Sequence, residues 1–235
     1  MSILDYEKRY DEILTNIEKV RVRVNQHQIV KIVAVSKSVE AKEISNMYSI
    51  GQRAFGENRV QALKSKTLEL ENLPIEWHFI GRLQTNKINA LIDLNPSLIH
   101  SCSSLELALE IDKRLKVKGK KIDALLQINS AKEEQKAGVM PEISLDTYDE
   151  IISTCSNINL KGVMSIGAHT DDKKVIKDSF EKTYAIYEEL KNKGAKYCSM
   201  GMSSDYELAV ECGANMLRIG STLFTNKRRT DEESL

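Results

Sequence analysis

Short apolar segments alternate with longer amphipathic segments along nearly the whole sequence, and this alternation restricts the possible folds more than any other feature. Continuous apolar runs are typical of strands buried on both faces of a parallel sheet, whereas apolar residues three or four positions apart are typical of helices. The predicted strands are residues 32–35, 54–57, 76–81, 98–102, 122–128, 160–166, 197–201 and 215–219. The predicted helices are residues 3–24, 41–50, 58–70, 84–94, 103–117, 145–155, 171–193 and 204–212.

The regular order of strands and helices predicts an α/β fold. Because about eight such units follow one another without a linker, we expect a single-domain (β/α)8 TIM barrel. The barrel would span residues 1–225 and would begin with an additional N-terminal helix. A doubly wound open sheet would give the same alternation and is the alternative. Residues 226–235 are mostly charged, and we expect them to form a disordered tail.

The composition bears on location and partners. The chain has 34 basic and 34 acidic residues, so no net positive field favours nucleic acid or an anionic membrane. Residues 1–9 lack the apolar core of a signal peptide, and no segment approaches the roughly 20 apolar residues of a membrane span. The four cysteines have no CxxC spacing, which favours buried, reduced thiols: Cys102, Cys155, Cys198 and Cys212. We therefore expect a cytoplasmic protein that binds neither nucleic acid nor membranes.

Ser36 and Lys37 follow at the carboxyl end of the first predicted strand. Barrels and open sheets both place ligands at the carboxyl ends of their strands. A lysine there, with its stem among apolar neighbours, is less readily protonated and can act as a nucleophile. Its amine would suit imine formation with an aldehyde such as pyridoxal phosphate (PLP). The alternative is an exposed lysine that opens a loop, which is the common situation for lysine.

Two glycine- and serine-containing loops follow the last two predicted strands, at residues 200–205 and 218–222. TIM barrels frequently bind phosphate with these two loops and a helix N-terminus, where backbone N–H groups and hydroxyls donate to the anion. The alternative is that Ser203 and Ser204 only cap a helix and that Gly220 only ends a strand. Together with Lys37, the loops predict a site for a phosphorylated aldehyde.

Other sites are not indicated by the sequence. It contains no GxGxxG, GxxxxGK[ST], HExxH or GxSxG motif. The histidines are scattered rather than spaced as metal ligands, so we expect no metal site: His27, His78, His100 and His169. Three methionines are interpreted as barrel filling: Met164, Met200 and Met202.

Several of these segments resemble the pyridoxal phosphate homeostasis proteins (the YggS/PROSC family), which are related to the amino-terminal barrel of alanine racemase. The resemblance extends from about residue 32 to residue 224, and the motifs after the third and seventh strands are long and specific. The matching segments are residues 34–37, 55–58, 78–87, 100–101, 127–129, 136–138, 199–205 and 218–221.

The resemblance implies a barrel of the alanine racemase N-terminal type that holds PLP as a Schiff base on Lys37. Asn58 would lie near the ring, and Arg218 would approach the pyridine nitrogen. Further cofactor-binding residues are expected in the last two loops, with Ser203, Gly220 and Ser221 at the phosphate: Met200, Ser203, Ser204, Gly220 and Ser221. The sequence departs from the family at Ser221, where threonine is frequent, and at Thr225, where glycine is frequent.

The resemblance also favours a binding protein over an enzyme. In alanine racemase a second proton-transfer group, a tyrosine, comes from a C-terminal β domain, and this sequence ends at Leu235, directly after the last barrel unit. An arginine at the pyridine nitrogen also weakens the cofactor as an electron sink. We therefore expect a protein of intracellular PLP homeostasis that affects amino and keto acid balance and has no catalytic residue.

Two alternative functions and several assignments stay open at this point. A PLP-dependent amino acid racemase of fold type III is the competing function, and a structural or regulatory protein without a ligand is a third. The expected partners are PLP and PLP-dependent apo-enzymes, and the expected state is a monomer or a weak homodimer. His78, Gln84 and Lys87 belong to the family motif but have no assigned role.

Overall fold

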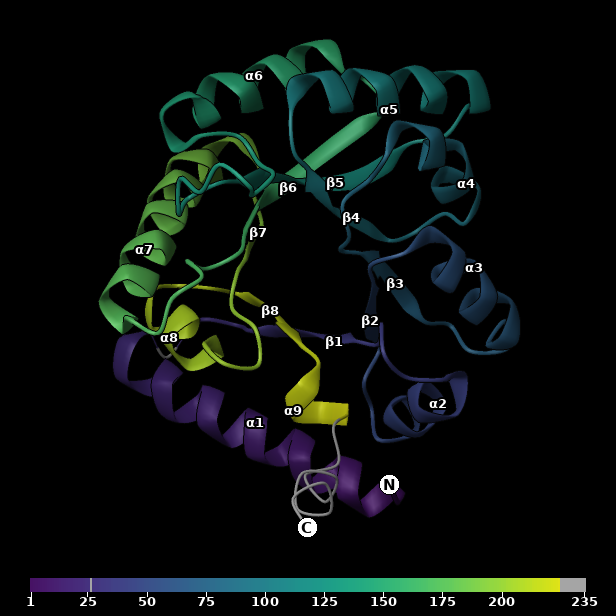
Figure 1. Cartoon of the computed structure of the whole chain (residues 1–235), viewed down its shortest axis with the longest axis vertical. Coiled ribbons are helices and arrows are strands. Elements are labelled where there is room, and N and C mark those ends of the chain that lie inside the picture. Colours follow the sequence, from purple (N-terminus) through teal and green to yellow (C-terminus); the bar gives the residue numbers. More distant parts are fainter. Residues whose placement is uncertain (26, 225–235) are drawn as a thin grey trace.

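The computed structural model describes residues 1–25 and 27–224, in which eight parallel strands close into a barrel. Helices surround these strands, as Figure 1 shows. Each strand pairs with the next one along the chain, and β8 pairs with β1 to close the sheet. The predicted single-domain TIM barrel is therefore confirmed, and the doubly wound open sheet is wrong.

The strands of the barrel are β1 (Lys31–Val35), β2 (Ala54–Glu57), β3 (Glu76–Phe79), β4 (Leu98–Cys102), β5 (Ile122–Ile128), β6 (Ile158–Ser165), β7 (Tyr197–Ser199) and β8 (Met216–Ile219). The helices are α1 (Ile3–Val24), α2 (Ala41–Ser49), α3 (Val60–Glu69), α4 (Ile88–Asp93), α5 (Leu105–Lys118), α6 (Ser144–Thr154), α7 (Lys173–Leu190), α8 (Tyr206–Glu211) and α9 (Ser221–Phe224). Short 3₁₀ turns are η1 (Thr85–Lys87), η2 (Pro141–Ile143) and η3 (Lys191–Lys193).

Some element ends differ from the prediction, mainly near the carboxyl ends of strands. β3 and β7 end at Phe79 and Ser199, two residues before the expected Gly81 and Gly201. The backbone at Gly201 has φ +91°, which is not a strand conformation, and the chain turns away from the sheet there. The single-turn helix α9 was not predicted, because four residues carry no recognisable periodicity.

The expected additional helix, α1, is present before the barrel. It begins at a capping box in which Ser2 and Asp5 bond each other's backbone N–H groups. Tyr6, Ile13 and Val20 are buried on one side of the helix, which packs against α2, α8 and α9. In Figure 1, α1 runs beneath α8 and α9, so it supports the elements that follow β7 and β8.

Apolar side chains fill two regions. The larger lies between the sheet and the helices, and the smaller lies inside the barrel and contains Val33, Ala54, Leu98, Leu125, Met164 and Met216. Because side chains alternate along a strand, the residues next to these inner positions on the same face also point inward. Several of them are polar and buried, including His78, His100, Ser199 and Arg218.

The thiol prediction is confirmed, since all four cysteines are free and buried. Burial raises the pKa of Cys102 and of Cys212 to about 12. No helix in the described ranges is long and apolar enough to cross a membrane. Thr225 and the predicted tail at 226–235 lie outside the described residues.

Candidate functional site

The end of β1 and the turn after β8 lie side by side at the carboxyl-end mouth of the barrel. Ala34 and Ile219 are paired in the sheet, and the chain continues from there to Lys37 and to Gly220. A Cβ atom placed on Gly220 would lie 3.3 Å from both the Cβ and the carbonyl oxygen of Val35. Glycine therefore permits this close approach, and it brings the turn after β8 next to the segment that carries Lys37.

Lys37 itself is exposed and lies in a turn two residues beyond the end of β1. It makes no hydrogen bond or ion pair with any residue in the described part of the chain. Of the two interpretations of the sequence, the structure shows the exposed lysine, since β1 ends at Val35 and Lys37 lies in the turn that follows. The amine is accessible to a ligand at the mouth.

Ser203 joins the two predicted phosphate loops. Its Oγ accepts hydrogen bonds from the backbone N–H groups of Gly220, at 3.2 Å, and Thr222, at 3.3 Å. Both donors belong to the turn that opens α9, so the hydroxyl oxygen occupies a position where an anion oxygen could accept the same bonds. Ser204 and Ser221 are exposed.

Ser203 and Ser204 do not cap α8, the helix that follows them. The N-cap residue of α8 is Asp205, and no side chain caps that helix. The Asp205 carboxylate instead accepts from Met202 N at 2.6 Å and closes the turn that contains both serines. Burial is the main influence on Asp205 and raises its pKa above 3.8.

Asn58 lies at the mouth where the segments after β2 and β3 meet. A Cβ atom on Gly81 would lie 2.0 Å from the carbonyl oxygen of Asn58, so the two backbones touch and only glycine fits. Asn58 is half-buried. This contact explains the glycine in the third-strand motif and places Asn58 on the β2 side of the mouth.

The methionines divide between core and surface. Met164 is buried inside the barrel, which confirms its assignment as barrel filling. Met200 is also buried, but it lies in the core outside the sheet. Met202 is 37% exposed, and its assignment as filling is wrong. Because the Met200 side chain is buried in the outer core, its backbone is the part of this residue that a ligand could reach.

Arg218 carries a buried positive charge below the mouth, on the inner face of β8. Its Nη1 donates to Ser199 Oγ at 2.8 Å and to Ser199 O at 2.9 Å, and its Nη2 donates to Ser165 O at 2.8 Å. Burial lowers the pKa of Arg218 to about 10, and the Asp205 carboxylate opposes that shift. Arg218 therefore stays protonated at neutral pH.

The sequence analysis assigned no role to a carboxylate that is buried at the end of β2. Glu57 is fully buried, and its Oε1 accepts from Ser36 Oγ at 2.6 Å and from Lys66 Nζ at 2.7 Å. Lys66 also donates to the carbonyl oxygen of Ser36 at 2.7 Å. The position of Glu57 as the last residue of an otherwise apolar strand was the available signal. These bonds hold the backbone immediately before Lys37.

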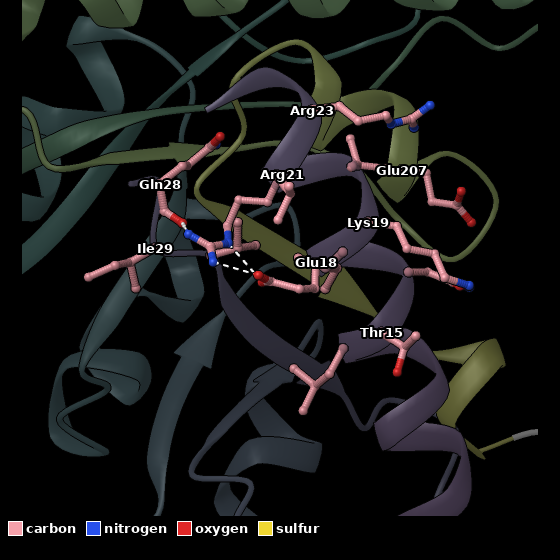
Figure 2. A pocket seen from close by; sticks show the side chains of 14 residues that line it. Thr15, Glu18, Lys19, Arg21, Arg23, Gln28, Ile29 and Glu207 are labelled. Carbon is pink, nitrogen blue, oxygen red and sulfur yellow. Dashed lines mark hydrogen bonds and ion pairs between the residues drawn. The ribbon is translucent and has the colours of Figure 1, made fainter. Parts of the chain in front are cut away.

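A cavity and a groove adjoin these residues. A cavity of about 250 Å³ lies on the side of β3, β5 and β6, where Lys136 donates to Glu133 at 2.7 Å and to Gly167 O at 2.8 Å. A groove of about 1080 Å³ runs past Ser203 and Ser204. Another groove, of about 1200 Å³, lies along α1 and holds none of the predicted site residues; Figure 2 shows it with the Glu18–Arg21 ion pair.

No group of three or more potential metal-ligating side chains occurs among the described residues. The donors at the mouth instead suit an organic anion, with hydroxyls and backbone N–H groups at the β7–β8 side, an accessible amine after β1 and a guanidinium underneath.

Comparisons with known proteins show the family to which the chain belongs. The profile of the alanine racemase N-terminal domain matches residues 9–227. The pyridoxal phosphate homeostasis protein of Helicobacter pylori strain J99 is 55% identical over 94% of this chain and 99% of that protein. The structure of PipY from Synechococcus elongatus with PLP bound is 32% identical, covers 88% of this chain and 99% of that chain, and has a TM-score of 0.75.

More distant structures support the fold alone. Alanine racemase of Clostridium difficile superimposes with a TM-score of 0.71 at 16% identity, over 90% of this chain and 57% of that one. The profile match and the high identity to a protein of matching length show the family. The chain belongs to the pyridoxal phosphate homeostasis proteins, within the alanine racemase N-terminal domain family.

Proposed function

We propose that the protein binds PLP at the mouth of the barrel, as a Schiff base on Lys37, and serves intracellular PLP homeostasis. The observation that carries the proposal is the contact of the Gly220 turn with Val35, which brings the donors at Ser203 and α9 beside the segment with the exposed lysine. The name of the Helicobacter pylori relative and the PLP bound to PipY support the same function.

The phosphate of PLP would be held by the last two loops. The backbone N–H groups at Gly220 and Thr222 already bond an oxygen, that of Ser203, so their arrangement suits an oxygen acceptor. Ser204 and Ser221 would add hydroxyl donors, and Met200 would take part through its backbone. Neutral donors are sufficient for a phosphate at such a turn because backbone N–H groups converge on one oxygen position.

When bound, PLP supplies an aldehyde that condenses reversibly with amines, with loss of water. Lys37 would provide the amine of the protein. The bonds among Ser36, Glu57 and Lys66 fix the backbone from which Lys37 extends, so only its flexible side chain has to be ordered. Asn58 would lie near the ring on the β2 side.

Arg218 would face the pyridine nitrogen of the cofactor. A guanidinium has donors but no acceptor, so it would donate to an unprotonated ring nitrogen and keep a proton away from it. An unprotonated pyridine withdraws electrons weakly, which favours storage and release of the cofactor over turnover of an amino acid. We therefore propose a binding protein without catalytic residues that passes PLP to apo-enzymes and so affects amino and keto acid balance.

We place this function in the cytoplasm, where reduced cysteines such as the four free thiols persist, and in a monomer or weak homodimer. A PLP-dependent racemase remains the competing function. An assay for racemisation over a panel of amino acids should give no signal, and a signal that disappears in Lys37→Ala would contradict the proposal.

The direct test is reduction with borohydride after incubation with PLP, followed by peptide mass mapping. We expect one pyridoxyl group, on the peptide that contains Lys37, and none on that peptide in Lys37→Ala. The control is Lys42→Ala, which removes another exposed lysine near the mouth-side end of α2 and should keep the adduct. An adduct on another lysine, or none in the unsubstituted protein, would overturn the proposal.

A further inference from the structure

A continuous chain of hydrogen bonds runs through the interior of the barrel and ends at Arg218. His78 Nε2 lies 3.0 Å from Glu76 Oε1, and His78 Nδ1 lies 2.8 Å from His100 Nε2. His100 Nδ1 lies 3.1 Å from Ser199 Oγ, which accepts from Arg218 Nη1 at 2.8 Å. His78, His100 and Ser199 are all 0% exposed, so the bonds among these three residues are shielded from bulk solvent.

When both imidazoles are neutral, the carboxylate at one end fixes the direction of every bond in the chain. Glu76 can only accept, so His78 carries its proton on Nε2 and donates to the carboxylate. His78 Nδ1 then accepts from His100 Nε2, and His100 Nδ1 accepts from the Ser199 hydroxyl. Ser199 Oγ in turn accepts from Arg218, which can only donate, and the two imidazoles have the same tautomer.

Opposite charges stand at the two ends. Glu76 is the first residue of β3 and pairs with Lys31, the first residue of β1, at the amino-terminal end of the barrel. Its hydrogen bond with His78 is the main cause that lowers the pKa of Glu76 to about 2. Burial lowers the pKa of His78 and, more strongly, that of His100, which keeps the imidazoles between the charges neutral. Arg218 lies two residues before Gly220, toward the mouth.

We propose that Glu76, His78, His100 and Ser199 are positioning residues for Arg218. These four residues orient its guanidinium, and the hydrogen bonds between them, which all point the same way, transmit the effect of the negative charge on Glu76 to Arg218. Hydrogen bonds in series polarise one another in a poorly solvated interior, so a change of charge at one end alters the bond at the other. The inference rests on the proposed function in one respect, that Arg218 faces the ring nitrogen of PLP. The cofactor's ring would thereby respond to the opposite end of the barrel.

The direction of the chain can be tested without cofactor. In ¹⁵N NMR spectra of the apo-protein, we expect His78 and His100 both to be neutral with the proton on Nε2. The guanidinium resonances of Arg218, assigned by their loss in Arg218→Lys, should shift in Glu76→Gln and not in Glu69→Gln, an exposed control on α3. The opposite tautomer at either histidine, or unchanged Arg218 resonances in Glu76→Gln, would overturn the proposal whether or not PLP binds.

The effect on the cofactor separates positioning from a merely structural role. Ser199→Ala should weaken PLP binding roughly tenfold, as expected for loss of a hydrogen bond to a charged group, and should shift the pH profile of the absorbance of bound PLP. Ser199→Thr, which keeps the hydroxyl, should restore the profile. Bound PLP with the same profile in Ser199→Ala, Glu76→Gln and the unsubstituted protein would contradict the proposal. Failure of PLP to bind the unsubstituted protein would instead refute the proposed function.

Discussion

The layer between the sheet and the helices differs in kind from the interior of the barrel. The outer layer is filled by apolar side chains such as Leu63, Leu115 and Phe180, each 0% exposed. The interior combines apolar side chains with a buried arginine, two histidines and a serine that bond one another. The interior of a TIM barrel is usually filled by branched apolar residues. The outer layer therefore follows the usual packing of the fold, and the polar part of the interior is where this chain departs from it.

The largest expected effect on stability belongs to the outer layer. Leu115→Ala should lower the free energy of unfolding by about 2–5 kcal/mol, because it removes a fully buried side chain and leaves a cavity. Urea denaturation measures this, with exposed Val117→Ala on the same helix, expected to change by under about 0.5 kcal/mol, as the control. Capture of PLP by Lys37 should be unchanged in both variants while they are folded. Loss of PLP capture in folded Leu115→Ala would show that binding at the mouth depends on the packing of the outer layer.

A smaller loss of stability is expected inside the barrel. Arg218→Met should cost about 1–3 kcal/mol, because the acceptors on Ser199 and Ser165 lose their donor. Unlike Leu115→Ala, it should also change the absorbance of bound PLP. The matched control is Arg82→Met, at an exposed arginine of the mouth, which should leave the urea midpoint unchanged. An unaltered PLP spectrum in Arg218→Met would contradict the placement of the ring nitrogen.

The difference between the regions also determines what the sequence could predict. The outer layer follows from periodicity, and nearly every strand and long helix was predicted for that reason. The contact between His78 and His100 could not be predicted, since it depends on the register of β3 and β4 and on the direction of both side chains. The exposure of Lys37 was one of two interpretations of the sequence, which could not decide between them because an apolar run does not show how the following turn directs the next side chains. The meeting of the Ser203 and Gly220 loops was predicted, because it follows from barrel topology.

As the pH falls, the interior of the barrel should lose stability at a higher pH than the outer layer does. The pKa of His100 and that of His78 in the folded protein lie below the ordinary value of 6.5. At a pH between each lowered pKa and 6.5, the unfolded chain therefore binds more protons than the folded protein. Their contribution to stability is therefore complete above about pH 6.5 and is lost as the pH falls. Glu76 loses its contribution at lower pH, from about 4.5 toward 2.

Urea midpoints measured between pH 7 and 5 should fall with decreasing pH in the unsubstituted protein. The fall should be shallower in His100→Gln, which removes the most strongly shifted group. It should be unaltered in His27→Gln, where the histidine is exposed. An equal slope in all three proteins would mean that the buried histidines do not control acid stability.

The smallest expected effect concerns one hydroxyl at the mouth. Ser203→Ala removes the acceptor of the Gly220 and Thr222 N–H groups and should change the urea midpoint only slightly, since both groups can reach water or a ligand. Its affinity for PLP should fall up to about tenfold, whereas its affinity for pyridoxal, which has no phosphate, should not change. Equal losses for both ligands would show that Ser203 does not bind the phosphate.

The most direct measurement is a crystal structure of the protein with PLP. We expect electron density that continues from Lys37 Nζ into the cofactor, with phosphate oxygens within hydrogen-bond distance of the N–H groups that open α9 and with the ring nitrogen beside Arg218. PLP attached at another lysine, or bound with its phosphate away from Ser203 and Gly220, would contradict the assignment of the site.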